Sequence, residues 1–204
     1  MNKKILSSIV IIAILLITLS STCHASASAK VFANGKSDNA HPCAVYAVDG
    51  LGRLGYSPCT SSIGQITKAS MLDWIKNSGN GYAMYVHTFG GSGYFNDYYG
   101  NSIGTASISG NWDFVFIDSS RSAETNALAT AFHTTGYSNR CFLGWSGDVS
   151  SYNSELFNYF FWIEYVNGSM AIRTAAINAA GRVAGSGTTP IRLYGSTTYT
   201  GAAR

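Results

Sequence analysis

The chain has 204 residues, of which only 11% are charged, and its formal net charge is +3 at pH 7. Two of the positive charges, Lys3 and Lys4, lie in a segment that we expect to be removed, and the other basic residues form no run. Such a nearly neutral mature chain argues against nucleic acid or an anionic membrane surface as a partner.

The N-terminal segment has the three parts of a secretory signal peptide. Two lysines precede an apolar run over residues 5–19, and the small residues 25–29 (Ala-Ser-Ala-Ser-Ala) follow it. The run is shorter than the about 20 apolar residues that a membrane-spanning helix needs. We therefore expect a cleaved signal peptide over 1–29, a polar leader over 30–42, and one exported domain without a stable membrane anchor over 43–204.

Three cysteines remain in the expected mature chain: Cys43, Cys59 and Cys141. Export would place them in an oxidising compartment, where cysteines commonly form disulfides. Cys43 and Cys59 are the closest pair in sequence, so we expect a disulfide between them, worth about 3 kcal/mol on the chain-entropy model. The alternative is that all three cysteines are small buried apolar residues.

The first half of the mature chain predicts two buried strands with a helix between them. The apolar run 44–48 stops at Asp-Gly, which is typical of a buried strand ended by a turn. Residues 51–63 predict a loop or a weak strand, and 67–78 predict a helix with one apolar face. A second buried strand is expected over 83–86, and the Gly- and Tyr-rich residues 88–110 indicate a small hairpin.

The second half alternates three more apolar strands with three amphipathic helices. Strands that are apolar throughout, each followed by a helix, indicate a mainly parallel sheet with helices on both faces. We therefore predict a single α/β domain with about six strands. The expected strands cover 114–117, 141–145 and 191–194, and the expected helices cover 122–135, 154–166 and 170–180.

Polar residues follow two of the expected strands. His87 comes directly after the strand 83–86, and Ser120 comes shortly after the strand 114–117. Ligands of open α/β sheets bind at the carboxyl ends of strands, so we expect these two strands to be parallel neighbours. His87 and Ser120 would then share one crevice, and a histidine facing a serine hydroxyl is the minimal arrangement for nucleophilic catalysis.

Several residues beside this pair are candidate binding residues: Gly90, Gly91, Ser119 and Arg121. Glycines allow backbone amides to approach a ligand closely. Asp118 can either orient the imidazole or cap the backbone at the strand end, and the sequence leaves both roles open. The mature histidines and cysteines show no metal-ligand spacing, and the glycines lack the Lys-Ser/Thr of a phosphate loop, so we expect no metal and no other cofactor.

Taken in order, these motifs resemble the caspase-like fold, and within it the gingipain-type bacterial cysteine peptidases. The likeness runs over about residues 43–196 and includes strand–His, strand–Asp-x-Ser-x-Ser, Leu-Gly-Trp-Ser-Gly and Ile-Arg-Leu-Tyr-Gly. The resemblance implies that His87 matches the family histidine and that Ser120 replaces the catalytic cysteine. Thr88 and Phe89 interrupt the His-Gly pair that the family carries.

Three functional interpretations follow from these residues. A serine hydroxyl is far less acidic than a cysteine thiol, which favours an exported peptidase homologue without appreciable peptidase activity that binds a protein or peptide. The second interpretation is a peptide or ester hydrolase that uses His87 and Ser120. The third is an extracellular adhesion or carbohydrate-binding protein, in which the tyrosines of residues 82–99 supply stacking surfaces.

Overall fold

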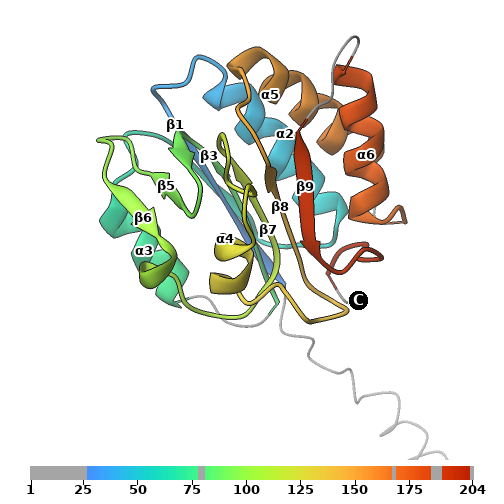
Figure 1. The fold of residues 1–204 in the computed structure, drawn as a ribbon, viewed down its shortest axis with the longest axis horizontal. Helices are drawn as coiled ribbons and strands as arrows, with labels where there is room; N and C mark the ends of the chain where they lie inside the picture. The colour runs from blue at the N-terminus through green and yellow to red at the C-terminus, as the bar shows by residue number, and fades with distance from the viewer. Residues whose placement is uncertain (1–26, 78–80, 167–168, 185–189, 203–204) are drawn as a thin grey trace, which may run out of the picture.

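The structure is a computed structural model that describes residues 27–77, 81–166, 169–184 and 190–202 (Figure 1). Six strands form the main sheet in the order β2-β1-β3-β7-β8-β9. All neighbours are parallel except β9, which pairs antiparallel with β8. The strands are β1 (Ser28–Asn34), β2 (Cys59–Gly64), β3 (Tyr82–His87), β7 (Trp112–Asp118), β8 (Cys141–Trp145) and β9 (Ile191–Gly195).

Helices cover both faces of this sheet, which confirms the predicted α/β class (Figure 1). One face carries α2 (Ala40–Arg53), α5 (Ser151–Asn158), η2 (Tyr159–Tyr165) and α6 (Ile172–Val183). The other carries α3 (Lys68–Asn77), α4 (Ala127–Ala131) and η1 (Thr105–Ser107), together with a small antiparallel sheet. The strands of that sheet, where a hairpin was predicted, are β4 (Gly90–Gly91), β5 (Tyr94–Asn96) and β6 (Ser102–Gly104).

Side-chain alternation along the central strands decides which face the functional residues occupy. Tyr85 and Phe116 pack into the core under α2 and α5, whereas the adjacent Val86 packs into the core on the α3 and α4 side. Because successive side chains of a strand point to opposite faces, His87 and Asp118 return to the α2 and α5 side. β3 and β7 are parallel neighbours, as predicted, and His87 is paired with Asp118 in their register.

Two predictions for the N-terminal third are wrong. Residues 30–34, expected in a polar leader, belong to β1, which lies between β2 and β3. Residues 44–48, expected as a strand, lie inside helix α2, and Pro42 occupies its first turn, where a missing N–H costs no hydrogen bond. The buried positions of α2 have helical spacing: Ala40, Cys43, Ala44, Ala47, Gly50 and Leu51.

The other predicted elements differ from the structure mainly in length. The helices expected over 67–78 and 170–180 are α3 and α6, and the weak strand expected within 51–63 is β2. The helix expected over 122–135 is reduced to α4, because turns replace its first part. The helix expected over 154–166 is α5 continued by the wider turns of the π-helical segment η2.

The expected disulfide between Cys43 and Cys59 is not formed, and both residues are free thiols. Cys43 is buried on α2, and burial raises its pKa; burial also raises the pKa of Cys59, to about 11. Thiols that stay protonated at neutral pH are poor nucleophiles for disulfide exchange. The structure therefore corresponds to the alternative in which the cysteines pack as small apolar residues.

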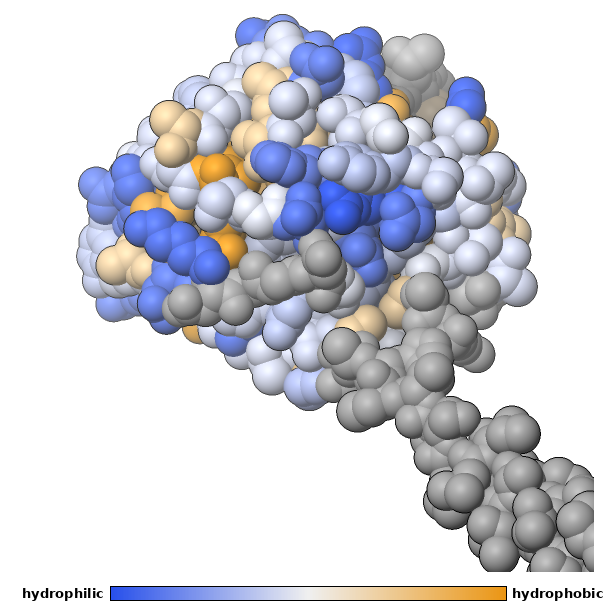
Figure 2. All heavy atoms as spheres, turned by 90° about the horizontal axis from the view of Figure 1, so that it is seen from below, coloured by the Kyte–Doolittle hydropathy of each residue, from blue (hydrophilic) through white to orange (hydrophobic). Residues whose placement is uncertain are grey.

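The signal peptide lies largely outside the described residues and stays a prediction. Among the residues that the structure describes, no helix is long and apolar enough to cross a membrane. Figure 2 shows the molecule from below, at the end where the parallel strands begin. Hydrophilic and intermediate residues cover most of this face, and hydrophobic residues gather beside α3. The polar residues discussed next lie at the opposite end of the sheet.

Candidate functional site

A cavity of about 200 Å³ opens at the carboxyl ends of β3 and β7. It is lined by Ser37 before α2, by residues 87–90 after β3, by 118–120 after β7, and by 149–151 and Ser154 at the start of α5. Most of these side chains carry a hydroxyl group. His87 and Ser120 both line the cavity and therefore share one crevice, as predicted.

Asp118 is the hydrogen-bonding centre of the site. Its side chain is almost fully buried. Burial raises the pKa of this carboxyl, but the opposite charge of His87 and the hydrogen bonds that it accepts outweigh burial and lower the pKa. Asp118 is thus a buried carboxylate. Its donors are the Tyr85 hydroxyl, His87 Nδ1, the Trp145 indole, the Ser154 hydroxyl and the Asn158 amide.

His87 connects this carboxylate to the loop before α2. Its Nδ1 lies 2.7 Å from Asp118 Oδ2, and its Nε2 lies 2.9 Å from both Ser37 Oγ and Asn39 Oδ1. The Asn39 amide is fixed because its Nδ2 donates to the Ser151 carbonyl at 2.6 Å. An acceptor oxygen therefore faces Nε2 and the carboxylate faces Nδ1, so both ring nitrogens of His87 have hydrogen-bond partners.

Ser120 does not form the dyad with His87 that its position suggested. Its hydroxyl accepts a hydrogen bond from the Val149 amide at 3.1 Å and lies 3.4 Å from the Val149 carbonyl. Among the described residues, the hydrogen-bond partner of the Ser120 hydroxyl is Val149 alone. Ser120 thus ties the end of β7 to the segment before α5, and within the described residues its hydroxyl is not hydrogen-bonded to the imidazole.

Ser119 is buried in the cavity wall with an unused hydroxyl. Its side-chain oxygen has no hydrogen-bond partner among the described residues. Gly90 packs against it: a Cβ at Gly90 would lie 2.5 Å from Ser119 Oγ and 2.7 Å from the Tyr94 carbonyl. Glycine is required at this position because any side chain would collide with the cavity wall. Both residues line the cavity, as expected of binding residues.

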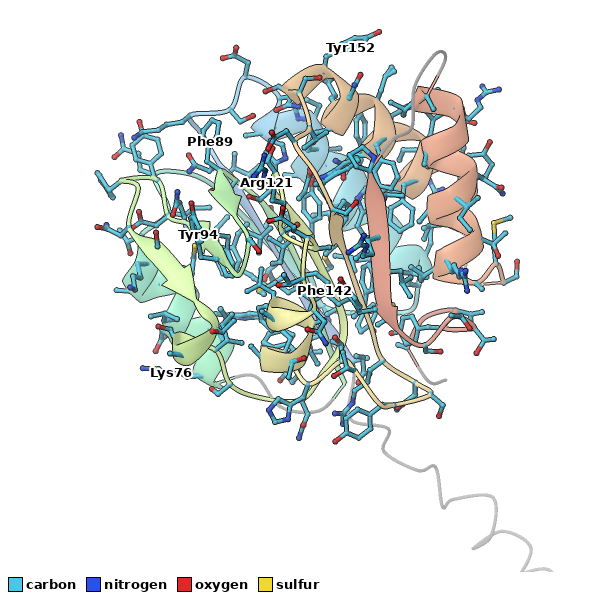
Figure 3. The ribbon with its side chains drawn as sticks, in the orientation of Figure 1. Lys76, Phe89, Tyr94, Arg121, Phe142 and Tyr152 are labelled. Atoms are coloured by element: carbon cyan, nitrogen blue, oxygen red, sulfur yellow. The ribbon has the colours of Figure 1, made fainter. Side chains whose placement is uncertain are left out.

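The other two candidate binding residues lie beside the cavity. Gly91 lies on β4, where a Cβ would meet the Tyr94 ring at 2.9 Å. Arg121 is exposed and forms an ion pair with Asp148 at 2.9 Å, and its φ of 61° directs the chain out of β7. Figure 3 labels Arg121 and also Phe89, a lining residue of the cavity that is 53% exposed. Phe89 thus supplies an apolar part of the rim.

Cys43, His87 and Asp118 bring potential metal-ligand atoms within 4.8 Å of one another. The direct 2.7 Å hydrogen bond between the imidazole and the carboxylate occupies the space where an ion would bind. Burial and the nearby Asp118 raise the pKa of the Cys43 thiol, which disfavours the thiolate that metals bind. The arrangement fits a hydrogen-bonded network better than ion coordination.

Sequence reasoning missed most of the residues that surround the pair. Ser37 and Asn39 lay in the assumed leader, and nothing in their local pattern links them to His87. A signal did exist for Ser154 and Asn158, which are four residues apart on the same helix face as the buried Phe157. Polar residues on the buried face of a predicted helix indicate a buried polar partner, which here is Asp118.

Comparison with known proteins supports the fold. No family model and no curated protein sequence matches the chain. Its structure is similar to the crystal structure of caspase-1 from Spodoptera frugiperda, with a TM-score of 0.54 and 8% sequence identity over 87% of this chain and 90% of that chain. Identity this low supports the fold and not the activity. The chain therefore has a caspase-like fold.

Proposed function

We propose that the chain is an exported homologue of caspase-like peptidases that binds a peptide or protein segment in this cavity and does not cleave it through Ser120. The proposal rests on one observation: the groups that would form the catalytic dyad are engaged elsewhere. His87 contacts Asp118, Ser37 and Asn39, whereas the Ser120 hydroxyl bonds to Val149. A general base must lie within hydrogen-bond reach of the attacking hydroxyl, and among the described residues the hydrogen-bond partner of the Ser120 hydroxyl is Val149.

The cavity wall supports a binding role. A buried hydroxyl without a partner costs about 1–3 kcal/mol, and a ligand that hydrogen-bonds to Ser119 would recover part of this cost. The exposed ring of Phe89 offers apolar contact area at the rim. Backbone amides and carbonyls of an extended segment suit a wall rich in hydroxyl groups, since hydroxyls both donate and accept.

The carbohydrate-binding interpretation has less support. Of the tyrosines in residues 82–99, Tyr85 is fully buried in the core and Tyr82 is half-buried against tryptophans. Tyr94 and Tyr99 are exposed at 37% and 58%, on the small sheet and the turn beside it. The exposed rings are therefore too few to form the extended stacking surface that motivated this interpretation.

A peptidase assay tests the loss of activity. The mature chain is incubated with a mixture of peptides at neutral pH, and products are followed by mass spectrometry. We expect no cleavage above the Ser120→Ala level, because no base faces the Ser120 hydroxyl. Robust cleavage by the wild type that Ser120→Ala abolishes would show that Ser120 is a nucleophile and would contradict the proposal.

A binding experiment tests the retained cavity. An immobilised peptide library is exposed to the wild type and to Gly90→Ala, whose added Cβ intrudes into the wall beside Ser119. We expect the wild type to retain a subset of peptides and Gly90→Ala to lose them. The control is Gly52→Ala, because a Cβ at this exposed helix position meets no atom within 4 Å. Retention of the same peptides by Gly90→Ala, or retention only on polysaccharide, would contradict a peptide-binding cavity.

A further inference from the structure

We propose that Ser37 is a nucleophile that forms a covalent adduct with activated esters and related serine-directed electrophiles when His87 is neutral. The Ser37 hydroxyl lies 2.9 Å from His87 Nε2 and donates to Asn39 Oδ1, and His87 Nδ1 lies 2.7 Å from Asp118. A hydroxyl, an imidazole and a carboxylate in this order and at these distances form an activated serine once the hydroxyl turns its proton from Asn39 to Nε2. This inference goes beyond the proposed function, because it concerns a different residue and a different reaction from peptide cleavage through Ser120.

The backbone holds Ser37 in a defined position. Its N–H donates to the Asn34 carbonyl at 3.1 Å, and its own carbonyl accepts from the Ala40 amide at 3.0 Å. Ser37 is thus fixed between the end of β1 and the first turn of α2. It is half-buried and lines the cavity, so a small electrophile in the cavity can reach its hydroxyl.

The same cavity offers a donor for the oxygen that becomes negative during attack. Ser119 lines the cavity, and its hydroxyl has no partner among the residues described by the structure. Hydrogen-bond donors that are free before the reaction are suited to stabilise such an oxyanion, because no existing bond must break first. Ser119 provides an observation independent of the geometry of Ser37 and His87.

The proton and the leaving group can be followed atom by atom. The Ser37 hydroxyl first turns its proton from Asn39 Oδ1 to Nε2 of neutral His87. The Nδ1 proton stays bound toward Asp118, and Nε2 takes the Ser37 proton as Oγ bonds to the carbonyl carbon of the ester. The bond from that carbon to the leaving oxygen then breaks, and the alcohol departs with the proton from Nε2. Asn39 Oδ1, 2.9 Å from Nε2, accepts the hydrogen bond of the transient imidazolium.

A fluorophosphonate probe tests the inference on the mature chain. Attack by Ser37 forms an O–P bond and releases fluoride, while His87 takes the serine proton. We expect the adduct to map to Ser37 by peptide mass spectrometry. Ser37→Ala removes the attacking oxygen, so this adduct should be lost. The control is Ser70→Ala, an exposed serine at the start of α3, which should label like the wild type.

A second variant keeps the test informative if Ser37→Ala does not fold. Ser37→Cys keeps the size of the side chain, and its thiol should react with iodoacetamide faster as pH rises. Labelling at Ser37 without peptide cleavage supports both this inference and the proposed function. Absence of labelling in a folded protein, with no fast-reacting thiol in Ser37→Cys, overturns the inference and leaves the proposed function intact. An adduct at Ser120 in place of Ser37 overturns both.

Discussion

Asp118 and Ser119 are consecutive residues, each 2% exposed, yet the hydrogen bonding of their side chains is opposite. Asp118 ends β7 and accepts hydrogen bonds from several distant segments, whereas Ser119 begins the following turn with an unpaired hydroxyl. A buried side chain whose hydrogen bonds are all formed makes its surroundings rigid. A buried side chain without a hydrogen-bond partner can still bond to a ligand. Asp118 at the end of β7 therefore has a structural role, and Ser119 in the turn after it is the residue that can bond to a ligand.

Asp118→Asn should have the largest effect on stability. The substitution removes the counter-charge of His87 and turns one acceptor oxygen into a donor that faces other donors. Removing one partner of a buried ion pair costs about 3–5 kcal/mol. We expect a loss of this size in the free energy of unfolding, measured by urea denaturation. A loss no larger than that of Asp148→Asn, which affects an exposed ion pair, would show that the network contributes little.

Acid should remove the same contribution in the wild type. The pKa of Asp118 is lowered in the folded protein, so its stabilisation is complete above the unfolded carboxyl pKa of about 3.9 and is lost as pH falls through the folded value. We expect the gap in unfolding free energy between wild type and Asp118→Asn to be constant above about pH 5 and to shrink below about pH 4. A gap that is independent of pH would mean that Asp118 is not ionised.

Gly90→Ala should have an intermediate effect. The new Cβ would meet Ser119 Oγ at 2.5 Å and the Tyr94 carbonyl at 2.7 Å, so the wall must shift. Overpacking of this kind costs about 1–3 kcal/mol, measurable by thermal unfolding. Gly52→Ala is the matched control, because its Cβ meets no atom within 4 Å and alanine favours the helix by about 0.5–1 kcal/mol. Equal destabilisation by both variants would contradict the close packing at Gly90.

Ser119→Ala should have the smallest effect. It removes a buried hydroxyl that forms no hydrogen bond within the described residues, so we expect no loss of unfolding free energy and a gain of about 1 kcal/mol, the lower end of the cost of an unpaired buried group. Ser122→Ala provides the contrast, since that buried hydroxyl donates to the Ile117 carbonyl at 2.6 Å and accepts from the Trp145 amide at 3.1 Å. Its loss should cost about 1–3 kcal/mol. Similar losses in both variants would show that Ser119 has a hidden structural partner.

The sequence predicted the sheet because its central strands carry a strong local signal. Residues 83–86 and 114–117 are apolar on both faces, as buried parallel strands must be, and each leads into a polar residue. Helix α2 was mistaken for a strand because a short apolar run has no readable period. The helical spacing becomes visible only when Ala40 and Leu51 are included. The assumed leader excluded the first of these from consideration.

Only those residues of the candidate site that follow the central strands could be predicted from the sequence. His87, Asp118 and Ser120 follow predictable strands, so strand ends alone brought them together. The direction in which each hydroxyl points depends on contacts far apart in sequence, such as Ser120 with Val149. No local pattern encodes such contacts, so the sequence left open which hydroxyl groups contact His87.

The hydrogen bond from Asn39 to the Ser151 carbonyl determines at which stage of folding the site forms. It joins residues 112 positions apart, and Asn158 bonds to Asp118 across 40. Contacts that close such long loops form late in folding, because the chain entropy must be lost before they contribute. A partly synthesised or translocating chain that lacks α5 therefore has no ordered site. Under the proposed export, any reactivity of this cavity would begin only after the whole domain has folded at its destination.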